Sequence, residues 1–495
     1  MRSCYDSAMD FPIPEEIQRV SRKLREAGFE AYLVGGCVRD LLLGRTPKDW
    51  DITTNAHPNQ IQEIFPDSFY ENDYGTVGVK TESEDSSLSI VEVTPYRSEG
   101  EYSDKRRPDE VTFGVSLDED LARRDFTVNA IAFDDSKGQL VDPFGGQKDI
   151  KDNVLRTVGE ADKRFAEDAL RMMRAVRFVA ELGFAIDTET ASAIHKNSEH
   201  LSHVSRERIR DELVRILNSK QPMTSLVLAQ QLGLLEYIAP DLVRGIGVEQ
   251  NQAHSYDVFG HLMRTMQHAA DKDWNFDIRL AGLFHDVSKP ETRRWSEEKQ
   301  DWTFHGHEVV GARVTKKALE DLKFSRETID KAVKMVRWHM FFSDPDQITL
   351  SAVRRIITSV GRENIDDLLK LRVCDRIGTG RPKEQPFRLR KYMAMVDQAL
   401  RDPISVNMLK TDGNRLMEKF HMKPGPRIGW TLDALLEEVL EDPKKNSEEV
   451  LDELTSKLLD LSDEELKNKG ESGKKAREAR EDEEVRQIME KHHVC

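Results

Sequence analysis

The most informative segment of the chain is Leu33-Val34-Gly35-Gly36-Cys37-Val38-Arg39-Asp40, which is followed closely by Asp49-Trp50-Asp51. The two glycines leave a backbone that can approach a phosphate closely, and the arginine supplies a forked donor for phosphate oxygens. On an extended strand residues i and i+2 point to the same side, so Asp49 and Asp51 are expected to project two carboxylates at one spot. Because paired carboxylates suit Mg²⁺, the segment predicts two-metal chemistry on a nucleoside triphosphate.

Hydrophobic periodicity predicts an α+β fold in which a small mixed sheet precedes a long helical region. The expected head has helices at 14–28, 38–43 and 58–65, and strands at 31–34, around residue 50, and at 76–80, 88–94, 127–133 and 139–141. Breaks in the later helical pattern suggest successive modules. The predicted domains are a head at 1–150, a helical neck at 151–220, a helical body at 221–380, a helical tail at 381–460 and a charged, solvated or disordered segment at 461–495.

Composition limits the class of protein. The 495 residues carry a net charge of -16, which at first argues against a nucleic-acid partner, but much of the acid is concentrated in the C-terminal part and arginine clusters stand nearer the N-terminus. The four cysteines have neither metal nor disulfide spacing. No leader or membrane-spanning run is recognisable, and no feature indicates a protein partner, so a cytoplasmic enzyme is expected.

Further head residues are candidates for the same site. Glu92, on the strand predicted at 88–94, is the best local candidate for a third carboxylate. Arg124, in the run Arg123-Arg124-Asp125-Phe126, could bind triphosphate oxygens, and the alternative is an ordinary surface ion pair with Asp125. Asn129 could orient a sugar.

The neck contains a candidate for base selection in the run Glu167-Asp168-Ala169-Leu170-Arg171. Asp168 and Arg171 are three residues apart, so on a helix they could brace each other. A carboxylate accepts from the amino group of cytosine or adenine and a guanidinium donates to the adjacent ring nitrogen, whereas guanine and uracil reverse that pattern. The alternative is an amphipathic helix with ordinary ion pairs, in which Arg174 adjoins Arg171 and Arg177 has rotated away.

These segments together resemble the class II tRNA nucleotidyltransferases, a family that comprises the CCA-adding enzymes and the bacterial poly(A) polymerases. The resemblance implies a polymerase-β-like head on helical neck, body and tail modules, with tRNA, CTP and ATP as partners. It implies metal binding at Asp49 and Asp51, nucleotide contacts at Gly36, Arg39 and Arg124, a protein template formed by Asp168 and Arg171, and phosphate-side positions for Arg174 and Arg177. The polar segment 97–109 resembles the flexible element that permits the switch from C to A addition, which argues against an enzyme that adds only CC.

A second candidate site lies in the helical half, where His261, His285-Asp286 and Asp375 have the spacing of ligands to a divalent metal of unknown identity. The alternative for each histidine is a buried, hydrogen-bonded core residue. The set resembles the HD phosphohydrolase superfamily, with His307 and His339 at its auxiliary ligand positions, and implies phosphoester hydrolysis through metal-activated water, as a repair activity on tRNA ends.

Two rival functions remain open at this stage. An A-adding enzyme or a poly(A) polymerase would share the head but would add only A. Alternatively, the protein would chiefly be an HD phosphohydrolase whose head serves as an RNA-binding module.

Overall fold

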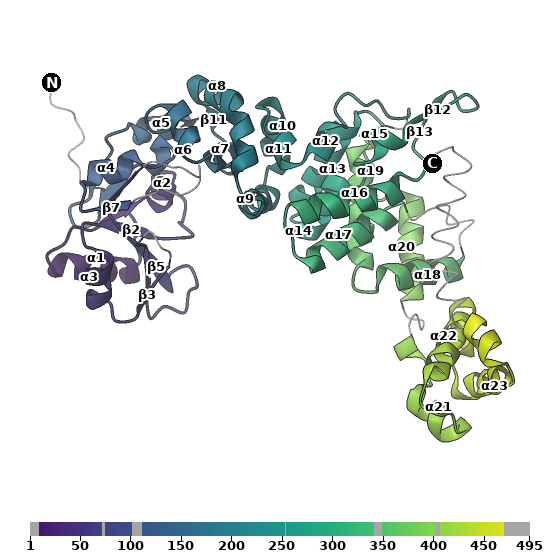
Figure 1. Ribbon diagram of the computed structural model, residues 1–495. Coiled ribbons are helices and arrows are strands. Elements are labelled where there is room, and N and C mark those ends of the chain that lie inside the picture. Colours follow the sequence, from purple (N-terminus) through teal and green to yellow (C-terminus); the bar gives the residue numbers. More distant parts are fainter. Residues whose placement is uncertain are drawn as a thin grey trace. The chain divides into compact units, whose positions relative to one another are not determined.

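The computed structural model describes residues 9–71, 75–100, 111–252, 254–340, 349–400 and 406–469. The chain divides into two compact units, Met1–Ile238 and Ala239–Cys495. The expected α+β fold is confirmed: the strands of the main sheet lie in the purple and blue part of the ribbon, and the teal to yellow part is almost entirely helical (Figure 1). Most of the polar segment 97–109, and residues 470–495 of the segment 461–495, lie outside the described residues, whereas residues 463–469 are helical and bury Leu466, so this part is not a solvated segment.

The head is built on a seven-stranded mixed sheet with the order β3-β4-β5-β2-β1-β8-β9. The strands are β1 (Tyr32–Val34), β2 (Asp51–Thr54), β3 (Ser68–Tyr70), β4 (Val77–Lys80), β5 (Ile90–Pro95), β8 (Ala132–Asp134) and β9 (Gln139–Val141). Strands β2 and β5 are parallel, and the other neighbours are antiparallel. The central strands β1 and β2 bury Leu33 and Ile52 completely, which fixes their register and therefore the position of Asp51.

The strand expected at 127–133 is wrong over its first part. Thr127–Asn129 forms a 3-10 turn, η1, and the strand β8 begins at Ala132. The run is buried throughout, and a short apolar run can be a buried strand or a buried turn with the same composition. Here Thr127 donates a 2.6 Å hydrogen bond to buried Asp149, which ties the turn to the following helix.

Helices complete the head, and the amphipathic helix expected at 14–28 is confirmed. The helices are α1 (Glu15–Glu26), α2 (Gly36–Leu42), α3 (Pro58–Ile64), α4 (Leu117–Ala122) and α5 (Gly146–Asp152). Ile17, Val20 and Leu24 of α1 are buried at helical spacing. A two-stranded ribbon, β6 (Arg97–Glu99) with β7 (Val111–Phe113), borders the undescribed residues 101–110, so the segment expected to be a loop begins as a strand.

The remainder of the first unit is helical. It contains α6 (Ala161–Glu167), α7 (Leu170–Leu182), α8 (Thr188–Asn197), η2 (Ser198–His203), α9 (Arg206–Asn218), α10 (Pro222–Gln231) and α11 (Leu235–Ile238), with a short parallel pair β10 (Val154–Leu155) and β11 (Ala185–Ile186). Helix α7 is buried on most of its surface, including Met172, Met173 and Val176. The finer division into five domains stays a prediction.

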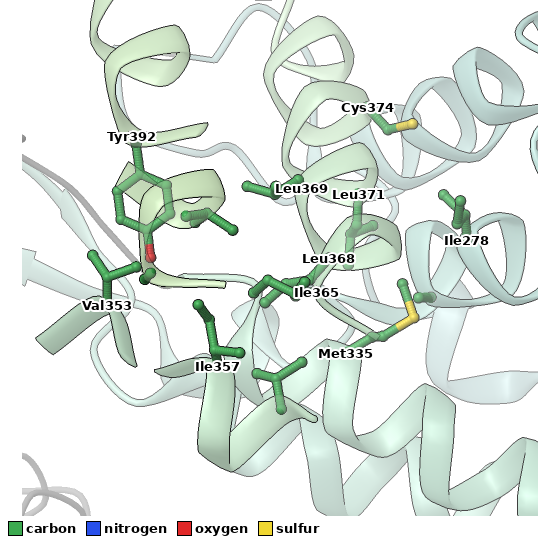
Figure 2. Close-up of a cluster of buried hydrophobic side chains, with 14 of the residues drawn as sticks. Ile278, Met335, Val353, Ile357, Ile365, Leu368, Leu369, Leu371, Cys374 and Tyr392 are labelled. Carbon is green, nitrogen blue, oxygen red and sulfur yellow. The ribbon is translucent and has the colours of Figure 1, made fainter. Parts of the chain in front are cut away.

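In the second unit several helices pack around α19 (Ile365–Gly378), and the C-terminal helices form a separate hydrophobic cluster that includes Leu435, Val439 and Leu451. Its elements are α12 (Pro240–Val243), α13 (Val258–Asp271), α14 (Phe276–Phe284), α15 (Lys289–Thr292), β12 (Arg294–Ser296), β13 (Asp301–Thr303), α16 (His307–Asp321), α17 (Arg326–Trp338), α18 (Leu350–Val360), α19 (Ile365–Gly378), α20 (Phe387–Ala399), η3 (Val406–Met408), α21 (Gly413–Phe420), α22 (Pro426–Glu441), η4 (Pro443–Lys445) and α23 (Glu448–Leu459). Figure 2 shows Tyr392 and Ile357 on one side of α19 and Ile278 and Met335 on the other. This packing fixes α19, which also carries Asp375.

No helix in the described ranges is both long and apolar enough to span a bilayer. Cys37 and Cys374 are buried free thiols.

Candidate functional site

Gly35 stands where the glycine turn, an arginine and a carboxylate meet. Its φ of +78° is a conformation that side-chain-bearing residues rarely adopt. A Cβ added to Gly35 would lie 3.0 Å from Arg124 Nη1 and 3.7 Å from Asp51 Oδ2. The predicted phosphate-binding turn, Arg124 and Asp51 are therefore close together in the head.

Two arginines of this site are oriented by buried acceptors. Arg39 donates from Nη1 to Asn129 Oδ1 at 2.7 Å and from Nε to Asp40 Oδ1 at 2.9 Å. Arg124 donates to Asp120 Oδ2 at 3.4 Å, and its buried Nε has no hydrogen-bond partner among the described residues. Asn129 holds Arg39 in place, and its expected role in orienting a sugar stays a prediction. Arg124 pairs with Asp120 rather than with Asp125, the alternative that the sequence had offered.

The carboxylates of the head lie close enough to one another for their negative charges to repel. Asp51 opens β2 and lies beside Glu92 in the register of β2 and β5. Asp49 does not share that strand as expected: it lies in an exposed bend two residues earlier. Desolvation, opposed by Arg124 and reinforced by Asp49 and Glu71, raises the pKa of Asp51 to about 6. Desolvation and the negative charges of Asp51, Glu71 and Asp49 raise the pKa of Glu92 to about 7.

Glu71 is a functional candidate that the sequence analysis missed. It follows the edge strand β3, and no local motif marks it. Only the strand order β3-β4-β5-β2 brings it toward Glu92 and Asp51. Its effect on the pKa of both Asp51 and Glu92 places its charge near theirs. This excess of acidic groups fits a bound divalent cation, which would relieve their repulsion.

Asp168 and Arg171 are held by other partners rather than by each other. Asp168 has extended backbone between α6 and α7, so it is not on the helix as expected, and its carboxylate receives two hydrogen bonds from Arg208 of α9 at 3.1 and 2.7 Å. Arg171 donates to Glu167 at 2.5 Å and to the carbonyl of Arg123 at 3.2 Å. The expected mutual bracing is wrong, because both side chains have closer partners.

A continuous set of contacts links helix α7, which carries Arg171 and Arg174, to the glycine turn. Arg39 contacts Asn129, Asn129 donates to Asp125 Oδ1 at 3.2 Å, and Asp125 accepts from Arg174 Nε at 2.8 Å. Burial alone would raise the pKa of Asp125, but Arg174 and Asn129 lower it to about 2, so this link is an ionised, buried pair. The carbonyl of Arg123, the residue before Arg124, also receives the Arg171 bond.

Arg177 has a different environment from the other arginines of α7. Its guanidinium is buried and donates to Glu212 at 2.7 Å and to Glu181 at 2.7 Å. The phosphate-side position implied for Arg177 stays a prediction.

In the second unit the predicted metal ligands form one buried cluster. The Nε2 atoms of His261 and His285 are 2.9 Å apart. His261 Nε2 lies 3.0 Å from Asp286 Oδ2 and 3.3 Å from Asp375 Oδ1. The donor atoms of these four residues lie within 4.8 Å of one another, which is compatible with one ion among them.

Asp286 belongs to a second group as well. Its Oδ1 lies 3.1 Å from His307 Nε2 and 3.4 Å from His339 Nε2. This buried oxygen makes no hydrogen bond within the described part of the chain. One carboxylate therefore faces two sets of histidines, one through each oxygen, and the two sets are compatible with two adjacent ions that share Asp286.

Backbone carbonyls orient three of the histidines toward the cluster. The Nδ1 atoms of His285, His307 and His339 each lie 2.6 to 2.9 Å from a carbonyl three residues earlier in the chain. These bonds make Nδ1 the donor and leave the Nε2 lone pair for an ion. Burial would lower the pKa of His285, but Asp286 and Asp375 raise it to about 9, which shows how strongly the cluster favours a positive charge.

The cluster opens into a cavity of about 980 Å³ that Asp286, His307, His339 and Asp375 help to line. Lys289 enters the same cavity and places Nζ 2.6 Å from Asp286 Oδ2. Two groups of three or more side chains that could ligate a metal are found in the described ranges, and both lie in the second unit.

Three family profiles match the chain in order: the Poly A polymerase head domain over residues 31–156, the probable RNA and SrmB-binding site of polymerase A over 183–245, and the HD domain over 258–378. The CCA-adding enzyme of Geobacillus thermodenitrificans (strain NG80-2) is 34% identical over 440 residues, which are 87% of this chain and 93% of that protein. The CCA-adding enzyme of Ligilactobacillus salivarius (strain UCC118) is 33% identical over 90% of this chain and 98% of its own length.

Solved structures show the same fold. The Bacillus stearothermophilus CCA-adding enzyme in complex with CTP has a TM-score of 0.63 and 29% identity, covering 90% of this chain and 98% of that one. The Thermotoga maritima CCA-adding enzyme complexed with tRNA has a TM-score of 0.54 and 19% identity, covering 89% and 94% of the two chains.

Proposed function

Because the chain belongs to the family of CCA-adding enzymes, we propose that it builds and repairs the 3′-CCA end of tRNA from CTP and ATP without a nucleic-acid template. Nucleotidyl transfer is assigned to the head and base selection to the neck. The observation that carries this assignment is the set of contacts from Arg39 through Asn129 and Asp125 to Arg174, which joins the two.

In the proposed head site Asp49 and Asp51 hold Mg²⁺, with Glu92 as the third carboxylate. The raised pKa values of Asp51 and Glu92 support this, since their charges repel until a cation is present. Bound metal would align the 3′-hydroxyl with the α-phosphate and stabilise the attacking and leaving oxygens. The backbone of Gly35 and Gly36 approaches the triphosphate.

Charge neutralisation on the triphosphate is assigned to Arg39 and Arg124. The buried Nε of Arg124, which has no partner among the described residues, supports its assignment to a ligand. Arg39 is held in place by Asn129 and Asp40, which reduces the entropy lost when it binds an oxygen.

Base selection is assigned to Asp168 and Arg171. Arg208 fixes the orientation of the Asp168 carboxylate, and Glu167 does the same for the Arg171 guanidinium. A base that presents an amino donor beside a ring-nitrogen acceptor satisfies both groups. Guanine and uracil reverse this pattern, so that an acceptor would face the carboxylate and a donor would face the guanidinium, and such mismatched polar contacts reject a wrong ligand strongly.

A second activity is proposed for the HD cluster, which would bind one or two divalent ions and hydrolyse phosphoesters. Asp286 supports it, because one of its buried oxygens makes no hydrogen bond to any described residue while two histidine Nε2 atoms face it. Such an ion supplies a nucleophilic water at neutral pH. A tRNA substrate and two buried free thiols favour a cytoplasmic location.

Separate substitutions test the assignment of activities to sites. Asp49→Ala should abolish nucleotide addition to tRNA and leave phosphoester hydrolysis intact, and His285→Ala should do the reverse. If Asp49→Ala retains nucleotide addition, the head assignment is wrong. If His285→Ala retains full hydrolysis, the HD cluster is not the hydrolase.

A further inference from the structure

The buried ring of Phe178, in helix α7, lies against three arginine side chains. The central carbon of the guanidinium is 5.4 Å from the ring centre for Arg39, 5.5 Å for Arg174 and 4.3 Å for Arg177. Arg39 comes from helix α2 of the head, whereas the other two arginines precede Phe178 on its own helix. Three like charges from two distant segments of the chain therefore meet around one uncharged group.

The Phe178 ring is held by the head as well as by its own helix. Arg174 and Phe178 are four residues apart on α7 and therefore lie on one face of it. Arg174 donates to Asp125 at 2.8 Å, and the next residue of the head, Phe126, places its ring 5.7 Å from that of Phe178 with the planes 89° apart. Phe126 is itself fully buried. The ring of Phe178 is therefore fixed before a nucleotide binds, which lowers the entropic cost of binding through the groups that it orients.

An aromatic ring is a suitable centre for these cations. The face of the ring is negative and attracts a guanidinium that lies within about 6 Å of its centre. Phe178, Arg39 and Arg177 are buried, so water screens the attraction little and its strength lies toward the upper end of the usual range. The hydrogen-bond acceptors of each arginine fix that arginine separately, whereas the ring is shared by all three.

We propose that Phe178 is a positioning residue for nucleotidyl transfer: its ring holds the Arg39 guanidinium in the orientation that meets the triphosphate, and it ties that orientation to helix α7. The proposal rests on the assignment of Arg39 to the triphosphate, made above, and adds the residue that links this arginine to the base-selection helix. CTP and ATP share the triphosphate, so the ring acts on both nucleotides equally. A ring that merely fills the core would act through its shape and not through the charge of its face.

Equilibrium dialysis of labelled CTP and of labelled ATP against the full-length chain, with Mg²⁺ and without tRNA, measures this role independently of catalysis. Site-specific replacement of Phe178 by trifluorinated phenylalanine keeps nearly the same shape but withdraws electrons from the face of the ring. Binding of both nucleotides should weaken roughly five- to thirtyfold, from the usual strength of a cation over a ring. The same replacement at Phe133, a buried ring of β8 that packs edge-on against Phe11, is the matched control and should leave both dissociation constants unchanged.

Two further variants test whether the ring acts through Arg39. Phe178→Leu keeps an apolar side chain but has no ring face, so it should weaken binding by at least as much as fluorination. In an Arg39→Ala background, fluorination of Phe178 should have no further effect, because the group that it orients is gone. A full additional loss in that background would overturn the action through Arg39.

The remaining outcomes separate this proposal from the function on which it rests. Equal binding by the wild type and the fluorinated protein would overturn the role of the ring. Weaker binding of only one nucleotide would also overturn it, since the effect would then lie on the base and not on the triphosphate. If the wild type binds both nucleotides but adds neither to tRNA, the proposed nucleotidyl transfer fails, and the loss of binding on fluorination still supports the orientation of Arg39 by the ring.

Discussion

Replacing Asp51 by asparagine should stabilise the metal-free protein while abolishing nucleotide addition. The pKa of Asp51 rises from 3.8 to about 6 on folding, so its charge is disfavoured in the folded state. Each pKa unit corresponds to about 1.36 kcal/mol, so the two-unit rise costs about 3 kcal/mol of stability. The cost is absent below pH 3.8, where Asp51 is protonated both folded and unfolded. It grows as the pH rises from 3.8 and is complete above pH 6.

Scanning calorimetry of the full-length chain at pH 8 in EDTA measures this effect. The two units can melt separately, so the transition that CTP shifts is assigned to the head. Asp51→Asn should raise its Tm by roughly 6 to 12 °C, at 2 to 4 °C per kcal/mol for a domain of this size. The gain should shrink as the pH approaches 4. Asp85→Asn is the control, because hydrogen bonds from Ser87 lower the pKa of that exposed carboxyl and its removal should give no gain.

Magnesium distinguishes the proposed cause from simple repacking. Mg²⁺ should raise the Tm of the wild type toward that of the variant, because the cation relieves the repulsion that the substitution removes, and it should move Asp51→Asn much less. An unchanged Tm for Asp51→Asn at pH 8 would refute the electrostatic reasoning. Equal stabilisation of both proteins by Mg²⁺ would refute Asp51 as a metal ligand.

Three further predictions concern other parts of the sites. Arg208→Ala should raise the kcat/KM for GTP and UTP relative to CTP by about tenfold or more, because Asp168 loses its bidentate partner. Single-nucleotide incorporation measures this ratio, and unchanged selectivity would contradict a role for the pair in choosing the base. Gly35→Ala should lower the free energy of unfolding in urea by about 1–3 kcal/mol and remove most of the nucleotide addition, since alanine would adopt a positive φ with its Cβ 3.0 Å from Arg124. A fully active, equally stable variant would show that the turn tolerates a side chain. Wild-type protein dialysed against a chelator should lose phosphoester hydrolysis and regain it with added Mn²⁺, and a phosphate-release assay that showed hydrolysis persisting without metal would exclude a metal-dependent HD site.

Local pattern was sufficient for much of the head but not for the contacts between its parts. Helix α1 and the strands at 76–80 and 88–94 follow from their own periodicity, and the structure confirms them. The turn at Thr127–Asn129 was missed because a buried turn and a buried strand have the same apolar composition. The bend that removes Asp49 from β2 directly follows Pro47, a turn residue that the prediction of a shared strand did not take into account.

Pairing partners were the least predictable feature. Asp168 and Arg171 have ideal spacing to brace each other, yet Arg208, forty residues later, and Glu167 hold them, because tertiary packing brings those side chains closer. Glu71 enters the acidic cluster only through the order of strands in the sheet. The four HD ligands were predicted by their spacing, whereas the position of Asp286 between two sets of histidines appears only in three dimensions.

The ordered product on a tRNA transcript that lacks its last three nucleotides tests the central assignment most directly. With CTP and ATP together the full-length chain should add three nucleotides, C, C and then A, and stop. With CTP alone it should stop after two, and with ATP alone it should add nothing to this transcript. A long A tail, or a single A added only to transcripts that already end in CC, would contradict the account.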